Sequence, residues 1–288
     1  MPIKYIVLGG GGYLGLTTLG SLYELQDKKI YDIDNIQEIY STSIGAFIAI
    51  ILCLKMDWGI LIKYIKDRPW QKVFSITADM ILNTVKKKGL MDNSFFNESL
   101  KNLLNSVDLT TDTTLQELFK YSKITLHIFS AKLNDMTLVD FNHKTHPNMK
   151  VVDAVYASST LPFIFQPFWY KDSYYLDGGL LNNYPLDICI KNGGQKDDIL
   201  GIKYTILPEN KVLKKDAEIV EFSFFIYKKF FRKLRKKTTI KISNEILIPC
   251  DAISIQECKD LLVDSDKRGK YIQKGKQAAR LFLSYKER

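Results

Sequence analysis

Short apolar runs alternate with longer amphipathic stretches along most of the chain, which is typical of a protein that alternates strands and helices. The apolar runs that predict strands are 4–8, 36–40, 124–131 and 199–206. The stretches with apolar residues three and four apart, which predict helices, are about 16–26, 44–54, 96–104 and 151–158. The pattern also predicts a hairpin partner for the third strand at 137–141, a helix that ends at about 191, a strand at 246–248 and a helix from about 267.

This alternation favours an α/β fold with a largely parallel central sheet and helices on both faces. The chain has 288 residues, of which 46% are hydrophobic, so it is long enough to bury a sizeable core. It contains no repeat and no low-complexity linker, and we predict one domain over residues 1–288. The longest apolar run, 44–54, stops at Lys55 and is too short to cross a bilayer.

The cysteines and the N-terminus indicate a reducing compartment. The four cysteines are scattered and form no C-x-x-C pair, which favours free thiols: Cys53, Cys189, Cys250 and Cys258. No charged segment followed by a long apolar core opens the chain, so we expect no signal peptide and an intracellular, cytoplasmic protein. No cluster of metal ligands and no calcium loop is visible, and we expect no cofactor and no metal.

The formal net charge of +9 is concentrated in one segment. Residues 221–241 hold eight Lys or Arg and one Glu, and the rest of the chain is nearly balanced. Within it, residues 222–237 mix aromatic and basic side chains, which suits peripheral contact with an anionic membrane. The alternative is an amphipathic helix with its aromatic residues in the core and a solvated basic face. No nucleic-acid motif accompanies the charge, so no nucleic acid is expected as a partner.

A predicted strand-to-helix turn carries the first candidate catalytic residue, Ser43. The strand is 36–40, the helical spacing starts at Ile44, and Gly45 follows. A serine on such a turn points its hydroxyl away from the backbone, where the N–H groups of the new helix favour a developing anion. This is the arrangement of a nucleophile elbow. The alternative is a small residue that fits a crowded junction.

A glycine loop, Gly9–Gly12, separates the first predicted strand from the first predicted helix. Glycines let a ligand approach exposed backbone N–H groups closely. Residues 10–15 match G-x-G-x-x-G of dinucleotide-binding proteins, but no acidic residue ends a second strand about 20 residues later. An oxyanion-binding loop would use the same donors, joined by the N–H that follows Ser43: Gly10, Gly11, Gly12 and Ile44.

A serine nucleophile needs a base, and the chain offers few histidines for that role. His127 alternates within a predicted strand, and His143 and His146 lie in a polar loop that we expect at the surface. No histidine follows His146. A carboxylate held in a dry site can serve instead, and Asp177, between a strand and a glycine turn, is the best-placed candidate. Ordinary Asp-Gly-Gly turn chemistry is the alternative for this residue.

Five blocks of the sequence, in order, resemble those of the patatin-like phospholipase family, and the resemblance covers nearly all of the chain. The blocks are Gly10–Gly15, Ser41–Gly45, Ala157–Pro162, Asp177–Gly179 and Asn182–Pro185. The first resembles the family's oxyanion loop and the second its G-x-S-x-G elbow, which carries the nucleophile role to Ser43. The fourth resembles its D-G-[AG] block, which carries the base role to Asp177.

The resemblance implies a three-layer α/β/α fold and a lipid acyl hydrolase of phospholipase A type that works through an acyl-serine, with a lipid or phospholipid as substrate. Two positions depart from the family pattern. Leu14 stands in place of a basic residue, and Ser41 stands in place of the first elbow glycine, where it would add a side chain to a tight turn. Two alternatives stay open: a weakly active or inactive lipid-binding relative, and a His-dependent serine esterase or acyltransferase.

Overall fold

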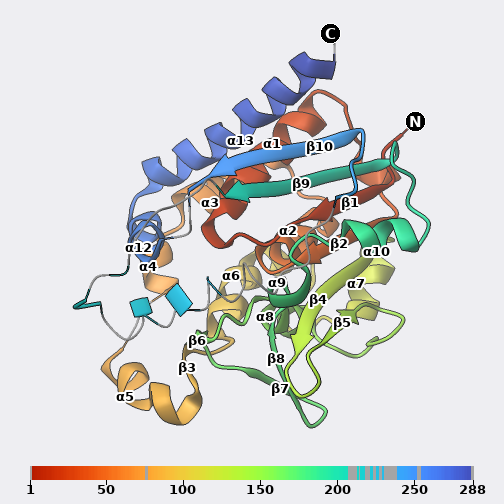
Figure 1. Cartoon of the computed structure of the whole chain (residues 1–288). Helices are drawn as coiled ribbons and strands as arrows, with labels where there is room; N and C mark the ends of the chain where they lie inside the picture. The colour runs from red at the N-terminus through yellow and green to blue at the C-terminus, as the bar shows by residue number, and fades with distance from the viewer. Residues whose placement is uncertain are drawn as a thin grey trace.

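The computed structural model describes residues 2–74, 77–206, 239–251 and 254–286, together with 213, 215–217, 221–222, 225–226 and 229. In this part of the chain a central sheet is covered by helices on both faces, as the sequence predicts (Figure 1). The strands of this sheet are β1 (Tyr5–Leu8), β2 (Glu38–Thr42), β4 (Thr125–Lys132), β5 (Thr137–Phe141), β7 (Phe168–Tyr170), β8 (Ser173–Asp177), β9 (Ile199–Ile206) and β10 (Asn244–Cys250). Two short strands, β3 (Gly89–Met91) and β6 (Phe163–Phe165), pair with each other outside it.

The strand order is β10-β9-β1-β2-β4-β8-β7, with β5 also paired to β4. The first five strands are parallel, whereas β5, β7 and β8 run antiparallel to their neighbours. The predicted hairpin of 124–131 and 137–141 is therefore confirmed. In the register, Thr42 lies opposite Phe129 and Ser130 lies opposite Asp177, so β4 places the ends of β2 and β8 at the same level.

The helices are α1 (Gly15–Asp27), α2 (Ile44–Cys53), α3 (Trp58–Asp67), α4 (Trp70–Val73), α5 (Ala78–Lys87), α6 (Ser94–Asn105), α7 (Leu115–Ser122), α8 (Val151–Ser159), α9 (Gly179–Asn182), α10 (Leu186–Lys191), α12 (Ile255–Val263) and α13 (Ser265–Lys286). The larger core joins one face of the sheet to α1, α2, α6, α8 and α13. A smaller core on the other face joins Val7, Tyr40 and Phe129 to α10. The two cores follow from the strands, whose successive side chains point to opposite faces.

The C-terminal helix α13 packs closely on α1 because both helices carry glycine at the contact. A Cβ at Gly20 would lie 2.0 Å from the carbonyl oxygen of Ile272, and a Cβ at Gly275 would lie 1.9 Å from that of Thr17. The hydroxyl of Ser21 donates to the carbonyl of Gly275. This contact anchors α1, and with it the glycine loop that precedes α1.

Several smaller predictions can be compared with the structure. None of the four cysteines forms a disulfide, as expected. Lys86 and Lys87 end α5, Lys88 follows in the left-handed conformation, and Gly89 begins β3. Most of the basic segment 222–237 lies outside the described residues. No helix in the described part of the chain is long and apolar enough to cross a membrane.

Candidate active site

Ser43 occupies a strained turn between β2 and α2. Its backbone has φ 56° and ψ −125°, a conformation that non-glycine residues rarely adopt, and only 8% of the residue is exposed. A Cβ at Gly45 would lie 2.6 Å from the carbonyl oxygen of Leu8, so only glycine allows α2 to start this close to β1. The predicted turn is therefore present, and its glycine is needed for packing.

Ser41, which departs from the family pattern, does not lie in the tight turn. It is a residue of β2, and its φ is not positive. The side chain is buried, and its hydroxyl donates to the carbonyl oxygen of His127 on the neighbouring strand. The added side chain is therefore accommodated inside the sheet.

The buried hydroxyl of Ser158, at the end of α8, holds the peptide of the turn. Its Oγ accepts a hydrogen bond from the N–H of Ser43 at 2.9 Å and donates to the carbonyl of Phe129 at 2.5 Å. The carbonyl of Ser158 also accepts the N–H of Gly178. One end of α8 thus joins the serine turn to the glycine turn of β8. The Ala157–Pro162 block contains Ser158, but the sequence alone assigns this residue no contact.

Asp177, the last residue of β8, lies against Ser43. The hydroxyl of Ser43 interacts with its carboxylate, and the N–H of Gly179 donates to its Oδ1 at 2.7 Å. The N–H of Asp177 donates to the carbonyl of Thr160, which keeps the end of β8 in place. Asp177 is 3% exposed. Burial raises its pKa to about 6, although the hydrogen bonds from Ser43 and Gly179 oppose this rise.

The glycine loop after β1 lies beside Ser43. A Cβ at Gly10 would be 3.0 Å from the Cβ of Ser43 and 2.5 Å from Oδ1 of Asn183. Asn183 fixes the loop, because its carbonyl accepts the N–H of Gly10 at 3.1 Å and its side-chain amide donates to the carbonyl of Gly10 at 2.8 Å. Within the described residues, no acceptor is found for the N–H groups of Gly11, Gly12 and Ile44. Among the described residues, three of the four predicted donors are thus left without a protein acceptor, while that of Gly10 is engaged.

Like Ser158, Asn183 belongs to this site although the sequence alone assigns it no contact. The feature that could have indicated it is the Asn182–Pro185 block. The neighbouring carbonyl of Asn182 accepts the hydroxyl of Thr42, the last residue of β2. The block therefore ties both the glycine loop and the end of β2 to the chain that follows Asp177.

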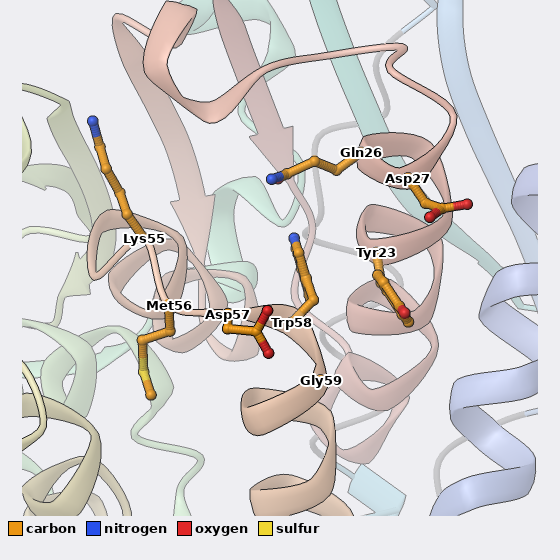
Figure 2. A pocket seen from close by; sticks show the side chains of 8 residues that line it. All are labelled: Tyr23, Gln26, Asp27, Lys55, Met56, Asp57, Trp58 and Gly59. Atoms are coloured by element: carbon orange, nitrogen blue, oxygen red, sulfur yellow. The ribbon is translucent and has the colours of Figure 1, made fainter.

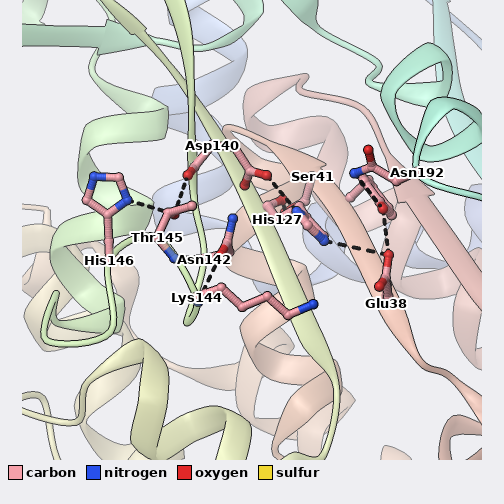
Figure 3. A network of polar contacts seen from close by, with 10 residues as sticks. Glu38, Ser41, His127, Asp140, Asn142, Lys144, Thr145, His146 and Asn192 are labelled. Carbon is pink, nitrogen blue, oxygen red and sulfur yellow. Dashed lines mark hydrogen bonds and ion pairs between the residues drawn. The ribbon is translucent and has the colours of Figure 1, made fainter.

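The three histidines make contacts other than with Ser43. His127 lies on the face of β4 opposite to that of Ser130, the residue paired with Asp177, and its ring stacks on Tyr40. Its Nδ1 is 2.6 Å from Oδ2 of Asp140, and its Nε2 is 3.6 Å from Oε2 of Glu38 (Figure 3). The prediction that His143 lies at the surface is wrong, because its ring is buried and stacks 3.7 Å from the ring of Phe119. Part of His146 is exposed, and its Nδ1 contacts the hydroxyl of Thr145 (Figure 3).

The network around His127 has a structural consequence that can be measured. Burial by itself lowers the pKa of His127, but its contacts with Asp140 and Glu38 outweigh burial and raise this pKa to about 9. The folded state therefore holds the proton more tightly than the unfolded state. The resulting stability, at most about 3 kcal/mol, is fully present below pH 6.5 and is lost as the pH rises through about 9.

We expect the His127→Gln variant to unfold at lower urea concentration than the wild type at pH 6. The difference should shrink steadily between pH 6.5 and pH 9.5, because the wild type loses the charged imidazole over this range. Urea unfolding of both proteins at four pH values measures it, with His146→Gln as the control for a partly exposed histidine. A difference that stays constant across the series contradicts the assignment of charge to His127.

Two hollows of the surface lie away from Ser43. One, of about 350 Å³, is lined by Tyr23, Gln26, Asp27, Lys55, Met56, Asp57, Trp58 and Gly59 (Figure 2). It lies beyond the C-terminal end of α2, whereas Ser43 precedes the N-terminal end, and ten helical residues span about 15 Å. The other, of about 570 Å³, is next to the first residues of β2 and β4. Neither belongs to the site at Ser43.

A buried carboxylate in contact with a serine at a strained strand–helix turn, beside a loop whose N–H groups at Gly11 and Gly12 have no acceptor among the described residues, is an arrangement suited to nucleophilic hydrolysis. The family described as patatin-like phospholipase matches residues 6–190. The chain therefore belongs to the patatin-like phospholipase family.

Comparison with known proteins gives distant relatives. The chain is 26% identical over 197 residues to the probable lipid hydrolase 463L of Invertebrate iridescent virus 6. The match covers 67% of this chain and 66% of that protein, so it spans just under two thirds of the viral protein's length. It is 26% identical to the uncharacterized protein R571 of Acanthamoeba polyphaga mimivirus, over 88% of this chain and 84% of that protein. Among solved structures, VipD from Legionella pneumophila superimposes with a TM-score of 0.58 at 17% identity, over 99% of this chain and 67% of that one, which supports the fold.

Proposed function

We propose that this protein is a lipid acyl hydrolase of phospholipase A type in which Ser43 is the nucleophile and Asp177 the base. The observation that carries the proposal is the contact between the Ser43 hydroxyl and the buried carboxylate of Asp177, whose pKa is raised to about 6. A base with a pKa near the working pH is ionised and can still accept a proton in the reaction. The family and the name of the viral relative support a lipid ester as substrate.

The proposed reaction has two halves. As Oγ of Ser43 attacks the ester carbonyl carbon, its proton passes to Asp177, and the carbonyl oxygen takes up the negative charge. That oxygen lies beside the N–H groups of Gly11, Gly12 and Ile44, which stabilise it. The tetrahedral intermediate collapses, the C–O bond to the alcohol breaks, and the alcohol or lysolipid leaves with the proton of Asp177. The product is an acyl-Ser43.

Water completes the cycle in the proposed second half. The oxygen of a water molecule attacks the acyl carbon while Asp177 accepts a proton from that water. The new oxyanion is bound by the same N–H groups. Collapse breaks the bond to Oγ of Ser43, which recovers its proton from Asp177, and a fatty acid is released. Ser158 and Asn183 are positioning residues in this scheme, since one holds the peptide of Ser43 and the other the glycine loop. The scheme uses no cofactor.

Covalent labelling tests this proposal directly. We expect a fluorophosphonate probe to modify the purified protein stoichiometrically, and mass spectrometry of the digest to place the adduct on Ser43. The same preparation should release fatty acid from mixed phospholipid and neutral-lipid micelles. Absence of both labelling and release would favour the alternative, an inactive lipid-binding relative. Labelling at another residue would contradict the assignment of the nucleophile.

A His-dependent esterase is the second candidate, and the contacts of the histidines speak against it. His127 is held by Asp140 and Glu38, and His143 is stacked on Phe119. In the proposed mechanism none of the three imidazoles takes part. Substitution of any one by glutamine should therefore leave labelling of Ser43 in place.

A further inference from the structure

Helix α5 presents apolar side chains to solvent. Leu82 is 82% exposed and Val85 is 91% exposed, and Ile81 on the same side of the helix is also exposed. The opposite side contacts the protein, where Met80 packs against the core. A helix at the surface of a globular protein normally has the reverse arrangement, with polar residues outward. In Figure 1, α5 projects from the lower left edge of the molecule, away from α13 at the upper edge.

Three consecutive lysines follow the apolar residues. Lys86 and Lys87 are the last residues of α5, and Lys88 caps the helix in the left-handed conformation. All three are exposed. The Nζ of Lys88 lies 5.5 Å from the ring centre of Tyr174 on β8. The acidic residue of this helix, Asp79, lies in its first turn and interacts with Asn83. The C-terminal end of α5 is therefore basic.

Two exposed aromatic side chains continue this surface. Phe163 lies opposite Gly89 in the β3–β6 pair, is 53% exposed and has a φ of 70°, which is costly for a bulky residue. Trp169 on β7 is 55% exposed, and its ring centre lies 4.6 Å from that of Tyr174. We call the surface formed by these aromatic residues and α5 the α5 face; its residues are Ile81, Leu82, Val85, Lys86, Lys87, Lys88, Phe163 and Trp169.

The α5 face is connected to Ser43 and Asp177 by short segments of chain. Phe163 comes five positions after Ser158, which holds the N–H of Ser43, so the two lie within about 18 Å. Tyr174, next to Lys88 and Trp169, precedes Asp177 on the same strand by three residues, about 10 Å. A ligand that covers the α5 face would therefore lie close to the proposed catalytic residues.

We propose that the α5 face docks on the surface of an anionic phospholipid bilayer, with Ile81, Leu82 and Val85 inserted below the head groups. Apolar side chains next to lysines, with a tryptophan at the rim, have the chemistry of an element that lies in a membrane interface. The lysines complement the negative charge of anionic head groups. The inference rests on the proposed function, which requires access to lipid esters in a bilayer.

A second copy of the chain is a less suitable occupant of this face. In a two-fold symmetric contact the same patch meets itself. In an antiparallel contact through α5, Lys86, Lys87 and Lys88 of one copy would meet the first turn of the other helix, where Asp79 is the only acidic residue of the helix, so most of the positive charge would stay unpaired. An anionic bilayer can neutralise all three lysines.

Vesicle co-sedimentation tests the docking. We expect the protein of residues 1–288 to sediment with vesicles of phosphatidylcholine and phosphatidylserine and more weakly with phosphatidylcholine alone. The Leu82→Asp/Val85→Asp variant should bind the mixed vesicles at least about tenfold more weakly. The Lys86→Glu/Lys87→Glu variant should lose the preference for anionic vesicles. Both variants leave the basic segment 222–237 unchanged.

The matched control is Leu281→Asp, which replaces a leucine that is 60% exposed on α13, at the far side of the molecule. We expect it to bind vesicles like the wild type. The proposal is overturned if Leu82→Asp/Val85→Asp sediments with the wild type, if Leu281→Asp loses as much binding, or if the wild type binds neither vesicle. The proposal is also overturned if the wild type does not bind vesicles and is instead a dimer that the Leu82→Asp/Val85→Asp substitutions dissociate.

Hydrolysis of two substrates separates this inference from the proposed function. A soluble short-chain ester does not require docking, so Leu82→Asp/Val85→Asp should hydrolyse it at the wild-type rate while losing activity on anionic vesicles. If the wild type hydrolyses neither substrate but still binds anionic vesicles through α5, the proposed function fails and the docking stands. If the variant retains full activity on vesicles, the docking fails and the hydrolase stands.

Discussion

The Ser43→Ala variant is expected to release fatty acid from lipid esters at least about four orders of magnitude more slowly than the wild type. The substitution removes the attacking oxygen and leaves the glycine loop and Asp177 in place. Alanine adopts a φ of 56° at a cost similar to that for serine, and the N–H that bonds to Ser158 is retained. The fold should therefore be preserved, and circular dichroism with thermal unfolding checks this.

Ser41→Ala is the matched control for this experiment. Ser41 is also buried, two residues earlier in the chain, but its hydroxyl donates to the carbonyl of His127 and not to Asp177. We expect this variant to keep most of its activity and its reaction with a fluorophosphonate. Full hydrolysis by Ser43→Ala, or an equal loss in Ser41→Ala, would rule out Ser43 as the nucleophile.

The second large effect is expected for Asp177→Asn, which should lower kcat/KM by two to four orders of magnitude, about the contribution of a general base. The amide is nearly isosteric with the carboxyl group, and its oxygen can still accept the N–H of Gly179. It cannot accept the proton of Ser43. Steady-state hydrolysis of a soluble ester measures the loss, with Asp172→Asn, a substitution in the exposed turn before β8, as the control.

The pH dependence of the wild type follows from the same residue. Burial raises the pKa of Asp177 to about 6, and the base must be ionised to accept a proton. We therefore expect kcat/KM to fall as the pH drops below about 6 and to level off above it. A profile that stays flat from pH 7 down to pH 5, or an Asp177→Asn variant with wild-type activity, would contradict the role of this residue.

The raised pKa of Asp177 also implies a cost in stability. Because the folded-state pKa lies above the ordinary value of 3.8, the folded protein favours the protonated form, and ionisation destabilises it as the pH rises from about 4 to above 6. Asp177→Asn removes this charge. The variant should unfold at higher temperature than the wild type at pH 8, and the difference should diminish towards pH 4. Activity and stability thus oppose each other at this position.

Local pattern predicted the elements that form the centre of the sheet. The strands at 4–8 and 36–40 and the helices after them have strong apolar periodicity, and β1, α1, β2 and α2 appear where it placed them. The strands β3 and β6 were not predicted. Each is three residues long and exists because it pairs with the other, more than 70 residues away, and short segments of this kind carry little local signal.

The sequence by itself determined which residues are candidates, because a serine at a strand–helix turn and an aspartate before two glycines are local patterns. Only the tertiary structure decided that they meet. Ser43 and Asp177 come together because β2 pairs with β4 in parallel and β8 pairs with β4 in the opposite direction. In the tertiary structure the N–H of Gly10 also donates to the carbonyl of Asn183, and Leu82 of α5 is exposed. Burial and hydrogen-bond partners depend on contacts between distant segments, and the spacing of residues within one segment does not specify those contacts.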